Sequence, residues 1–409
     1  MRVSIEMRVR RVAAIIAGIV LGSAMGASQA AESPGNAFQD GQGGFVVSHI
    51  AYALSAKDAS ENGACPNGMT LGNTQIVQAS AEGKRHEGES DADYASRVQA
   101  EATKLSTAAN GDNLCMHPES GTPDPHYKTV AGINIPVYGI DLDGQDSRTN
   151  GRAAPNTCPH DDFRGVNGER GIDNQFYRVV GCSPSFQSTG QSNTFEIEMY
   201  TGAWGILITL KGVHDLQNQK DIEVGIYANA DPIQLSPTRE ALPNATYAVD
   251  QDPRFRATTH GRIVNGVLTT DPVDVRFHVV TNSIRLERPL QDARLRMTFT
   301  PEGGLEGIMA GYVPVEAMYN YQFAYRDGKD GAGKPANQRL IYGSANGAAR
   351  VLGHTCNGVY YALKQSADGH RDPKTGQCDS ISTQYRIKAI PAFVVNASTQ
   401  SINSTLEKQ

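Results

Sequence analysis

Acidic and amide side chains gather in one glycine-rich stretch, from Gly139 to Phe176, whose second half reads "CPHDDFRGVNGERGIDNQF". Carboxylate, amide and carbonyl oxygens are the ligands of calcium, which takes about six to eight of them. Glycine lets backbone carbonyls turn toward such an ion. The stretch therefore predicts a calcium site, and its candidate ligands are Asp141, Asp143, Asp161, Asp162, Asp173 and Asn174.

The spacing of these acids does not match the EF-hand loop. A loop that begins at Asp141 would place Arg152 where the bidentate Glu belongs, and one that begins at Asp161 would place Phe163 at a ligand position. The predicted site is therefore composite, with Asp141 and Asp143 at one strand end and the later acids on the returning chain. Two other interpretations stay open: an acidic loop held only by its own hydrogen bonds, and a catalytic loop in which His160 acts beside Asp161.

Six cysteines offer a way to hold so long a loop, and an even count in an exported protein favours disulfides. We expect disulfides among Cys65, Cys115, Cys158, Cys182, Cys356 and Cys378. Pairing of nearest neighbours in the sequence would join 65 to 115, 158 to 182 and 356 to 378, although spacing alone does not fix the connectivity. Zinc is disfavoured because no C-x-x-C or H-x-x-x-H spacing occurs.

The N-terminus predicts export. Four arginines within the first 11 residues precede the apolar run Val12 to Leu21, and a small-residue pattern then allows cleavage after Ala30. Removal of residues 1–30 would leave 33 basic and 42 acidic residues, a net charge of about −9 instead of −6. An acidic surface argues against nucleic acid as a partner, and no later segment is apolar for long enough to predict a transmembrane helix. We expect a periplasmic or secreted protein.

Period-two alternation dominates the middle of the chain. Ile222, Val224 and Ile226 alternate with polar residues, and so do the apolar residues of "VDVRFHVV" and "TFEIEMY". Strands follow one another without helices long enough for parallel crossovers, which favours antiparallel pairing. The sequence predicts a mainly β fold: an antiparallel β-sandwich, lectin-like or jelly-roll-like, with small helical, disulfide-closed additions.

The change of pattern along the chain predicts four segments. Residues 1–30 are the signal peptide, 31–125 an N-terminal extension with one helix, 126–300 the sandwich with its acidic loop, and 301–409 a mixed α/β segment. The helix of the extension begins at a capping box, Ser90 to Asp93.

A resemblance rests on "CPHDDF", on the Gly-Ile-Asp-Asn element at 171–174 and on the following "GILITLKGVHDLQNQKDIEVGIYANAD". These motifs resemble a group of uncharacterised exported bacterial proteins with a Gly-Ile-Asp-Asn element. The resemblance covers about Gly139 to Asp231 and implies export and a shared structural element. It implies no reaction.

The sequence leaves both enzymatic and non-enzymatic functions open. Gly-x-Ser-x-Gly, His-Glu-x-x-His and nucleotide-binding glycine motifs are absent from the sequence. We therefore expect a non-enzymatic cell-envelope or extracellular binding protein, with a carbohydrate or an envelope protein as its partner and calcium in the loop. The alternatives are a secreted glycosidase or esterase, with Glu196 and Glu198 as candidate carboxylates, and a structural partner in an envelope assembly.

Aromatic residues are the candidates for a carbohydrate platform. "YNYQFAY" places Tyr319, Tyr321, Phe323 and Tyr325 at alternating positions. Such a row favours a core or interface stripe, and a ligand platform is the alternative. Trp204 precedes a buried run and is expected in the core.

Overall fold

The period-two segments of the sequence form one large sheet. The computed structural model describes residues 38–58, 61, 63–131, 134–147, 151–188, 190, 199–201 and 204–396, and strands outnumber helices there, so the mainly β prediction is confirmed. The sheet has 12 strands: β1 (Phe38–Gln39), β2 (Gln42–Tyr52), β5 (Ile206–Lys211), β6 (Asn218–Ala228), β7 (Ala245–Ala248), β8 (Arg256–Val264), β9 (Val267–Thr270), β10 (Val273–Thr281), β11 (Ile284–Phe299), β12 (Leu305–Pro314), β13 (Gly369–Arg371) and β14 (Cys378–Val395). The signal peptide, Glu196, Glu198 and most of "TFEIEMY" lie outside the described residues.

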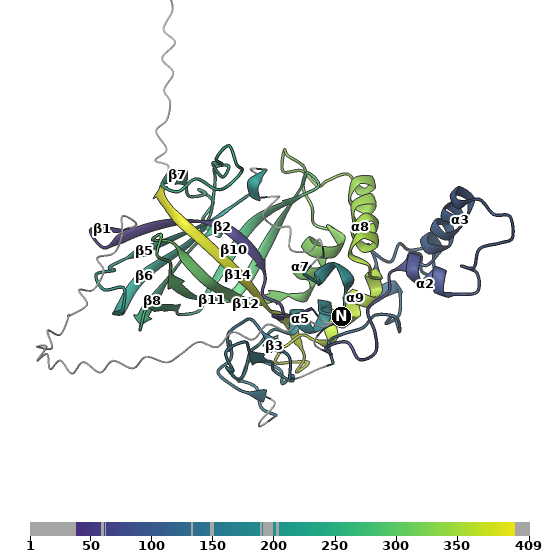
Figure 1. Ribbon diagram of the computed structural model, residues 1–409, viewed down its shortest axis with the longest axis horizontal. Helices are drawn as coiled ribbons and strands as arrows, with labels where there is room; N and C mark the ends of the chain where they lie inside the picture. The colour runs from purple at the N-terminus through teal and green to yellow at the C-terminus, as the bar shows by residue number, and fades with distance from the viewer. Residues whose placement is uncertain are drawn as a thin grey trace, which may run out of the picture. The chain divides into compact units, whose positions relative to one another are not determined.

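The sheet closes on itself. Its order runs β2-β5-β6-β8-β9-β11-β12-β14, and β14 then pairs with β2, with Tyr385 opposite Tyr52 (Figure 1). Every pairing in this ring is antiparallel, as the sequence predicted. Opposite walls of the closed sheet face each other and take the place of the two sheets expected in a sandwich.

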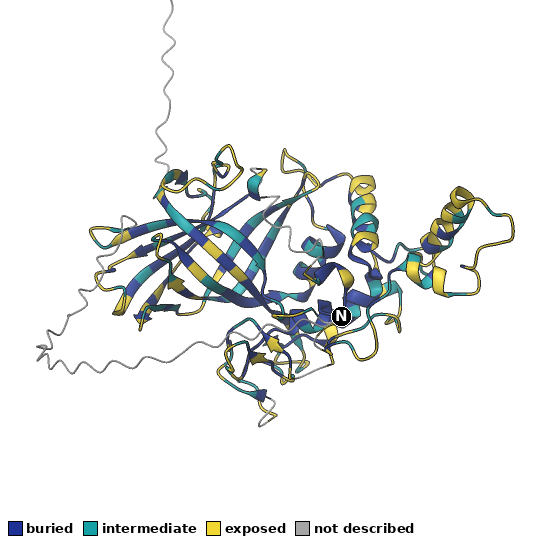
Figure 2. Ribbon diagram, in the orientation of Figure 1, coloured by how far each residue is buried: buried dark blue, intermediate teal, exposed yellow. Residues whose placement is uncertain are grey.

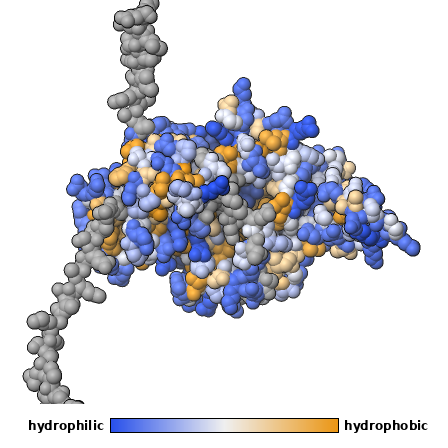
Figure 3. Space-filling view, turned by 45° about the horizontal axis from the view of Figure 1, so that its top comes forward, coloured by the Kyte–Doolittle hydropathy of each residue, from blue (hydrophilic) through white to orange (hydrophobic). Residues whose placement is uncertain are grey.

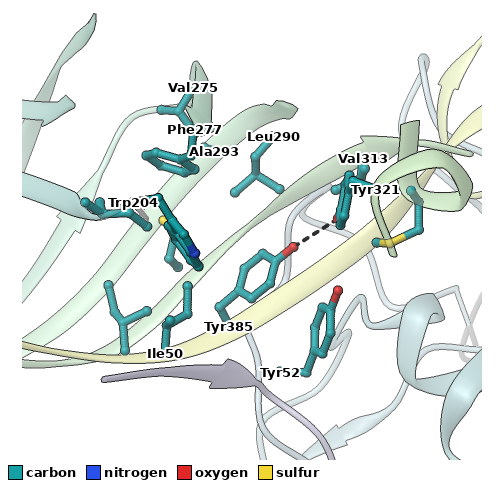
Figure 4. Packing of buried hydrophobic residues seen from close by; sticks show 14 of the residues in the cluster. Ile50, Tyr52, Trp204, Val275, Phe277, Leu290, Ala293, Val313, Tyr321 and Tyr385 are labelled. Atoms are coloured by element: carbon teal, nitrogen blue, oxygen red, sulfur yellow. Dashed lines mark hydrogen bonds between the residues drawn. The ribbon is translucent and has the colours of Figure 1, made fainter. Parts of the chain in front are cut away.

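Every second side chain along the strands points into the interior of the closed sheet. In β8 the buried residues Ala257, Thr259, Gly261 and Ile263 alternate with exposed ones (Figure 2). A strand points successive side chains to opposite faces, so this alternation separates an interior from a solvated face. Figure 4 shows the interior, where Trp204 lies near Tyr385 and the hydroxyl groups of Tyr321 and Tyr385 are 3.4 Å apart.

Helices and short strands gather beside the closed sheet. The helices are α2 (Asn73–Ala79), α3 (Asp91–Lys104), α5 (Gln175–Val180), α7 (Val315–Tyr319), α8 (Gln338–Leu352) and α9 (Cys356–Gln365), the π-helix η5 (Asn320–Ala324) and the 3-10 turns η1 (Pro118–Ser120), η2 (Pro184–Phe186) and η4 (Pro253–Phe255). A separate parallel pair joins β3 (Pro136–Val137) to β4 (Arg164–Gly165). The predicted cap of α3 is confirmed, because the Ser90 hydroxyl accepts from the Asp93 amide at 3.1 Å.

The tyrosine-rich segment is part of the core. It forms α7 and η5 instead of a strand, and all four aromatic residues are buried: Tyr319, Tyr321, Phe323 and Tyr325. Trp204 is also buried, as expected. Because none of these rings faces solvent, the segment does not provide a carbohydrate platform.

The three disulfides connect distant parts of the chain. They join Cys65 to Cys182, Cys115 to Cys356, and Cys158 to Cys378, so the expected nearest-neighbour pairing is wrong. The bonds span 117, 241 and 220 residues, because cysteines pair by position in the fold rather than by position in the sequence. Three disulfides indicate an oxidising compartment outside the cytoplasm.

The predicted segments share one sheet. β2 lies in the expected N-terminal extension and β14 in the C-terminal segment, yet each supplies a wall of the closed sheet, and residues 34–409 group into one unit by their contacts. No helix in the described part of the chain is long and apolar enough to cross a membrane. Figure 3 shows one face, on which hydrophobic residues form separate small spots among hydrophilic ones.

Candidate metal centre

Two apolar residues fix the first arm of the acidic loop. Ile140 and Leu142 are buried against Ala310 and Tyr312 of β12. Asp141 is exposed and Asp143 is half-buried, so anchoring these two apolar residues leaves both carboxylates outside that apolar cluster. Gln384 of β14 holds the arm in place, because its side chain exchanges two hydrogen bonds of 2.7 Å with the backbone of Ile140.

A small antiparallel bridge brings two more acids together. Phe163 and Ile172 exchange backbone hydrogen bonds of 3.0 and 3.1 Å, and both are buried. In this register Asp162, which precedes Phe163, lies opposite Asp173, which follows Ile172. Their carboxyl groups hydrogen-bond to each other, and their side chains are only 2% and 5% exposed.

The two arms converge on one cluster of oxygens. Single carboxylate oxygens of Asp141, Asp143 and Asp173 all lie within 4.8 Å of one another. Backbone amides orient them: Leu142 donates to Asp173 at 2.6 Å, Gly144 to Asp141 at 2.6 Å and Gln145 to Asp143 at 2.8 Å. We call Asp141, Asp143 and Asp173, together with the neighbouring Asp162 and Asp368, the acidic centre.

Glycine is needed at position 171, where the returning chain passes close to the segment that carries Asp141 and Gln145. Its φ of +69° is disfavoured for residues with a side chain. A Cβ here would lie 2.5 Å from the carbonyl oxygen of Gln145 and 3.2 Å from Oδ2 of Asp141. Glycine therefore allows a carbonyl oxygen and a carboxylate oxygen to lie close to the returning chain.

Asp368 reaches the centre from the C-terminal part of the chain. It is 4% exposed, and its carboxylate accepts a hydrogen bond of 2.7 Å from the Ser382 amide. Its carbonyl accepts from the amide of Cys158 at 2.8 Å, next to the Cys158–Cys378 disulfide. That disulfide and this hydrogen bond tether the loop to β14.

The electrostatics of the centre oppose ionisation of all its acids. Burial, together with neighbouring carboxylates, raises the pKa of Asp173 well above its usual range. Burial likewise raises the pKa of Asp162 to about 6 and that of Asp368 to about 7, and it raises the pKa of Asp141. Burial raises the pKa of the Tyr312 hydroxyl as well. The nearby carboxylates of Asp173, Asp368 and Asp143 raise it further.

Two arginines in the described part of the chain interact with the loop around the centre. Arg294 donates to the carbonyl of Leu142, and Arg170 pairs with Asp146 at 3.0 Å. The five acids of the centre plus Asp146 outnumber these two arginines. A divalent cation would supply further positive charge, and the donors are the oxygens that calcium prefers.

The structure brings together four of the six predicted ligands. Asp141, Asp143 and Asp173 form the oxygen cluster and Asp162 lies beside them. Asp161 is exposed, and its carbonyl accepts from Gln175 at 3.4 Å.

Asn174 has a different role from the predicted one. It caps α5, where its side-chain oxygen accepts from the Tyr177 amide at 3.2 Å. His160 contacts the Ala367 carbonyl at 3.0 Å, and burial lowers its pKa, which fits a hydrogen-bonded loop histidine.

Sequence reasoning missed Asp368. It lies 195 residues beyond Asp173, in the short segment "SADGH", and no local spacing marks it as a ligand. Only the closure of the sheet and the Cys158–Cys378 disulfide bring it near the loop.

Comparisons with protein family models, with curated proteins and with solved structures find no match for this chain. The resemblance to exported proteins with a Gly-Ile-Asp-Asn element stays a prediction.

Proposed function

We propose that the acidic centre binds one calcium ion, and that this ion stabilises the loop of an exported binding protein that acts in the periplasm or outside the cell. The observation that carries the proposal is the convergence of Asp141, Asp143 and Asp173, with oxygens within 4.8 Å of one another. Ionised carboxylates at this distance repel one another unless a cation or protons are shared between them.

Calcium fits the donors better than magnesium or zinc. Magnesium demands near-ideal octahedral geometry and keeps several waters, whereas calcium accepts flexible shells of carboxylates and carbonyls. Zinc takes sulfur and nitrogen ligands, and all six cysteines are in disulfides.

A stabilising role fits the burial of the centre better than hydrolysis does. Asp162 and Asp173 are 2% and 5% exposed, so a glycan chain cannot pass between them. Glycosidases instead place two carboxylates on either side of a substrate cleft. The proposed ligand of the whole protein is a carbohydrate of the envelope or its surroundings.

The proposal predicts a calcium-dependent melting temperature. At pH 8, calcium at about one hundred times its Kd should stabilise the protein by about 2.7 kcal/mol relative to EDTA. At about 2 cal/mol/K per residue, this corresponds to roughly 3 °C for a chain of this length. Differential scanning fluorimetry would measure the shift.

Two matched variants separate a specific site from general charge effects. Asp143→Asn should abolish the calcium shift, because Asp143 is in the oxygen cluster. Asp161→Asn removes the same charge from the same loop but lies outside the cluster, so it should keep the shift. Absence of a shift in the wild type, or an equal shift in both variants, would contradict the proposal.

A further inference from the structure

A pocket of about 470 Å³ opens beside β2 and β14, and none of the five acids of the acidic centre lines it. Its lining includes His49 and Ala51 of β2, the segment 54–58 that follows β2, Tyr138, and Arg386 of β14. Ligand sites usually measure about 300 to 1,000 Å³, so this pocket has room for a small organic ligand.

The register of the sheet places Arg386 on the outer face of β14, at this pocket. Arg386 and Lys388 are exposed and alternate with buried residues, so both point away from the interior of the closed sheet. Arg386 lies opposite Ala51 and Lys388 opposite His49, and opposite residues of an antiparallel pair project from the same face. Burial, followed by the positive charges of Lys388 and Arg386, lowers the pKa of His49, so both cations act at this face.

The guanidinium of Arg386 is held by its flat face. Its Cζ lies 4.4 Å from the centroid of the Tyr138 ring, which is a cation–π contact. Tyr138 is itself fixed, because its amide donates to the Leu54 carbonyl at 3.1 Å. No hydrogen bond or ion pair of this guanidinium occurs within the described part of the chain. Stacking uses the face of a guanidinium, so its N–H donors, which lie in the plane, stay available in a fixed orientation.

The charge of the lining favours a ligand with a single negative charge. Lys57 lines the pocket together with Arg386, and Asp58 and Glu61 are the acids that line it. Because the lining holds as many acids as it holds lysines and arginines, it repels a dianion such as phosphate or sulfate more than it repels a monoanion. A carboxylate is a monoanion, and its two oxygens match the guanidinium fork with two parallel N–H···O bonds.

We infer that this pocket binds an organic carboxylate, whose two oxygens accept hydrogen bonds from the in-plane N–H groups of Arg386. The carboxylate belongs either to a free small acid or to a uronic acid unit of a glycan. The inference rests on the proposed binding function and gives that function a site and a ligand class. It does not involve the calcium ion.

Isothermal titration calorimetry with the full chain in calcium tests the inference. The carboxylate probes are lactate, benzoate, glucuronate and a disaccharide that ends in glucuronate, and the neutral counterparts are lactamide, benzamide and glucose. We expect at least one carboxylate to bind about tenfold more tightly than its neutral counterpart, since hydrogen bonds to a charged group are the stronger ones. The free acids and the glucuronates tell which source supplies the carboxylate.

Three results would overturn the inference. In the first, no carboxylate of the panel binds. In the second, the neutral counterparts bind as tightly as the carboxylates. In the third, inorganic phosphate or sulfate binds more tightly than every carboxylate.

Two matched variants locate the site. Arg386→Met removes the donors and keeps an unbranched side chain, so it should raise the Kd for the carboxylate about tenfold. Lys388→Met removes the same charge from the same face but lies outside the lining, so it should raise Kd by less than about threefold, as expected for an exposed charge. Both side chains are exposed, so both melting temperatures should stay close to that of the wild type. An unchanged Kd in Arg386→Met, or equal effects of the two variants, would overturn the assignment of the site.

Calcium measurements keep the two proposals apart. Arg386→Met should retain the calcium shift in melting temperature, and Asp143→Asn should retain carboxylate binding. A calcium shift without carboxylate binding would overturn this inference alone, whereas carboxylate binding without a calcium shift would overturn only the calcium proposal.

Discussion

Asp162→Asn should stabilise the calcium-free protein at pH 8. Asp162 is 2% exposed, and its Oδ2 accepts from the Ser147 amide at 2.7 Å. The amide oxygen of asparagine can keep this bond. Its nitrogen can donate to Asp173 in place of the carboxyl proton that joins the two acids. The substitution therefore imitates the protonated carboxyl while it removes the charge.

The magnitude follows from the shift in pKa. Folding raises the pKa of Asp162 from 3.8 to about 6, so the folded state binds the proton more tightly than the unfolded state does. Below about pH 4 the carboxyl group of Asp162 is protonated in both states, so its ionisation does not lower the free energy of unfolding. The free energy of unfolding then falls between pH 4 and 6, by about 3 kcal/mol in total, because each pKa unit corresponds to about 1.4 kcal/mol. The variant should lack this loss, which amounts to about 3 to 4 °C in melting temperature.

Urea denaturation in EDTA at pH 4.5 and pH 8 would measure the effect. The variant should exceed the wild type by up to about 3 kcal/mol at pH 8 and by only about 1 kcal/mol at pH 4.5, because most of the wild type's loss lies above that pH. An Asp162→Asn protein that is less stable than the wild type at pH 8, or a difference that does not depend on pH, would refute the reasoning about the centre.

Three further predictions concern the same fold. The pKa of Asp368 is raised to about 7, so metal-free wild type should lose stability up to about pH 7, and Asp368→Asn should flatten the upper part of this slope in EDTA denaturation curves. Removal of the Cys158–Cys378 disulfide by the double serine variant should cost about 2 to 5 kcal/mol and raise the Kd for calcium in a titration; an unchanged Kd would show that the disulfide does not order the loop. Phe277 is 1% exposed inside the closed sheet, so Phe277→Ala should lower the free energy of unfolding by about 3 to 5 kcal/mol. A decrease of less than about 1 kcal/mol in urea denaturation would contradict its place in the core.

Local pattern was enough to predict the strands. The alternation at Ile222, Val224 and Ile226 identifies β6, and that at Val275 and Phe277 identifies β10, because one face of each strand is buried. The helix cap at Ser90 could be predicted in the same way, since it depends on residues within one turn.

Long-range contacts could not be predicted from spacing. Closure of the sheet depends on β14 meeting β2, more than 300 residues earlier, and the disulfides follow that closure. For the same reason Asp368 was not among the expected ligands. Asp161 and Asn174 were among the expected ligands, although Asp161 is exposed and Asn174 caps a helix. Residue type alone does not distinguish a ligand oxygen from an exposed acid or a helix cap.

The location of a bound ion tests the calcium proposal most directly. Crystals of the full chain grown with calcium, or soaked with a lanthanide, would show the ion by its anomalous scattering. We predict one strong peak between Asp141, Asp143 and Asp173, at about 2.3 to 2.6 Å from their oxygens for calcium. An ordered acidic centre without a peak, with the three carboxylates held only by protons and backbone amides, would contradict the account.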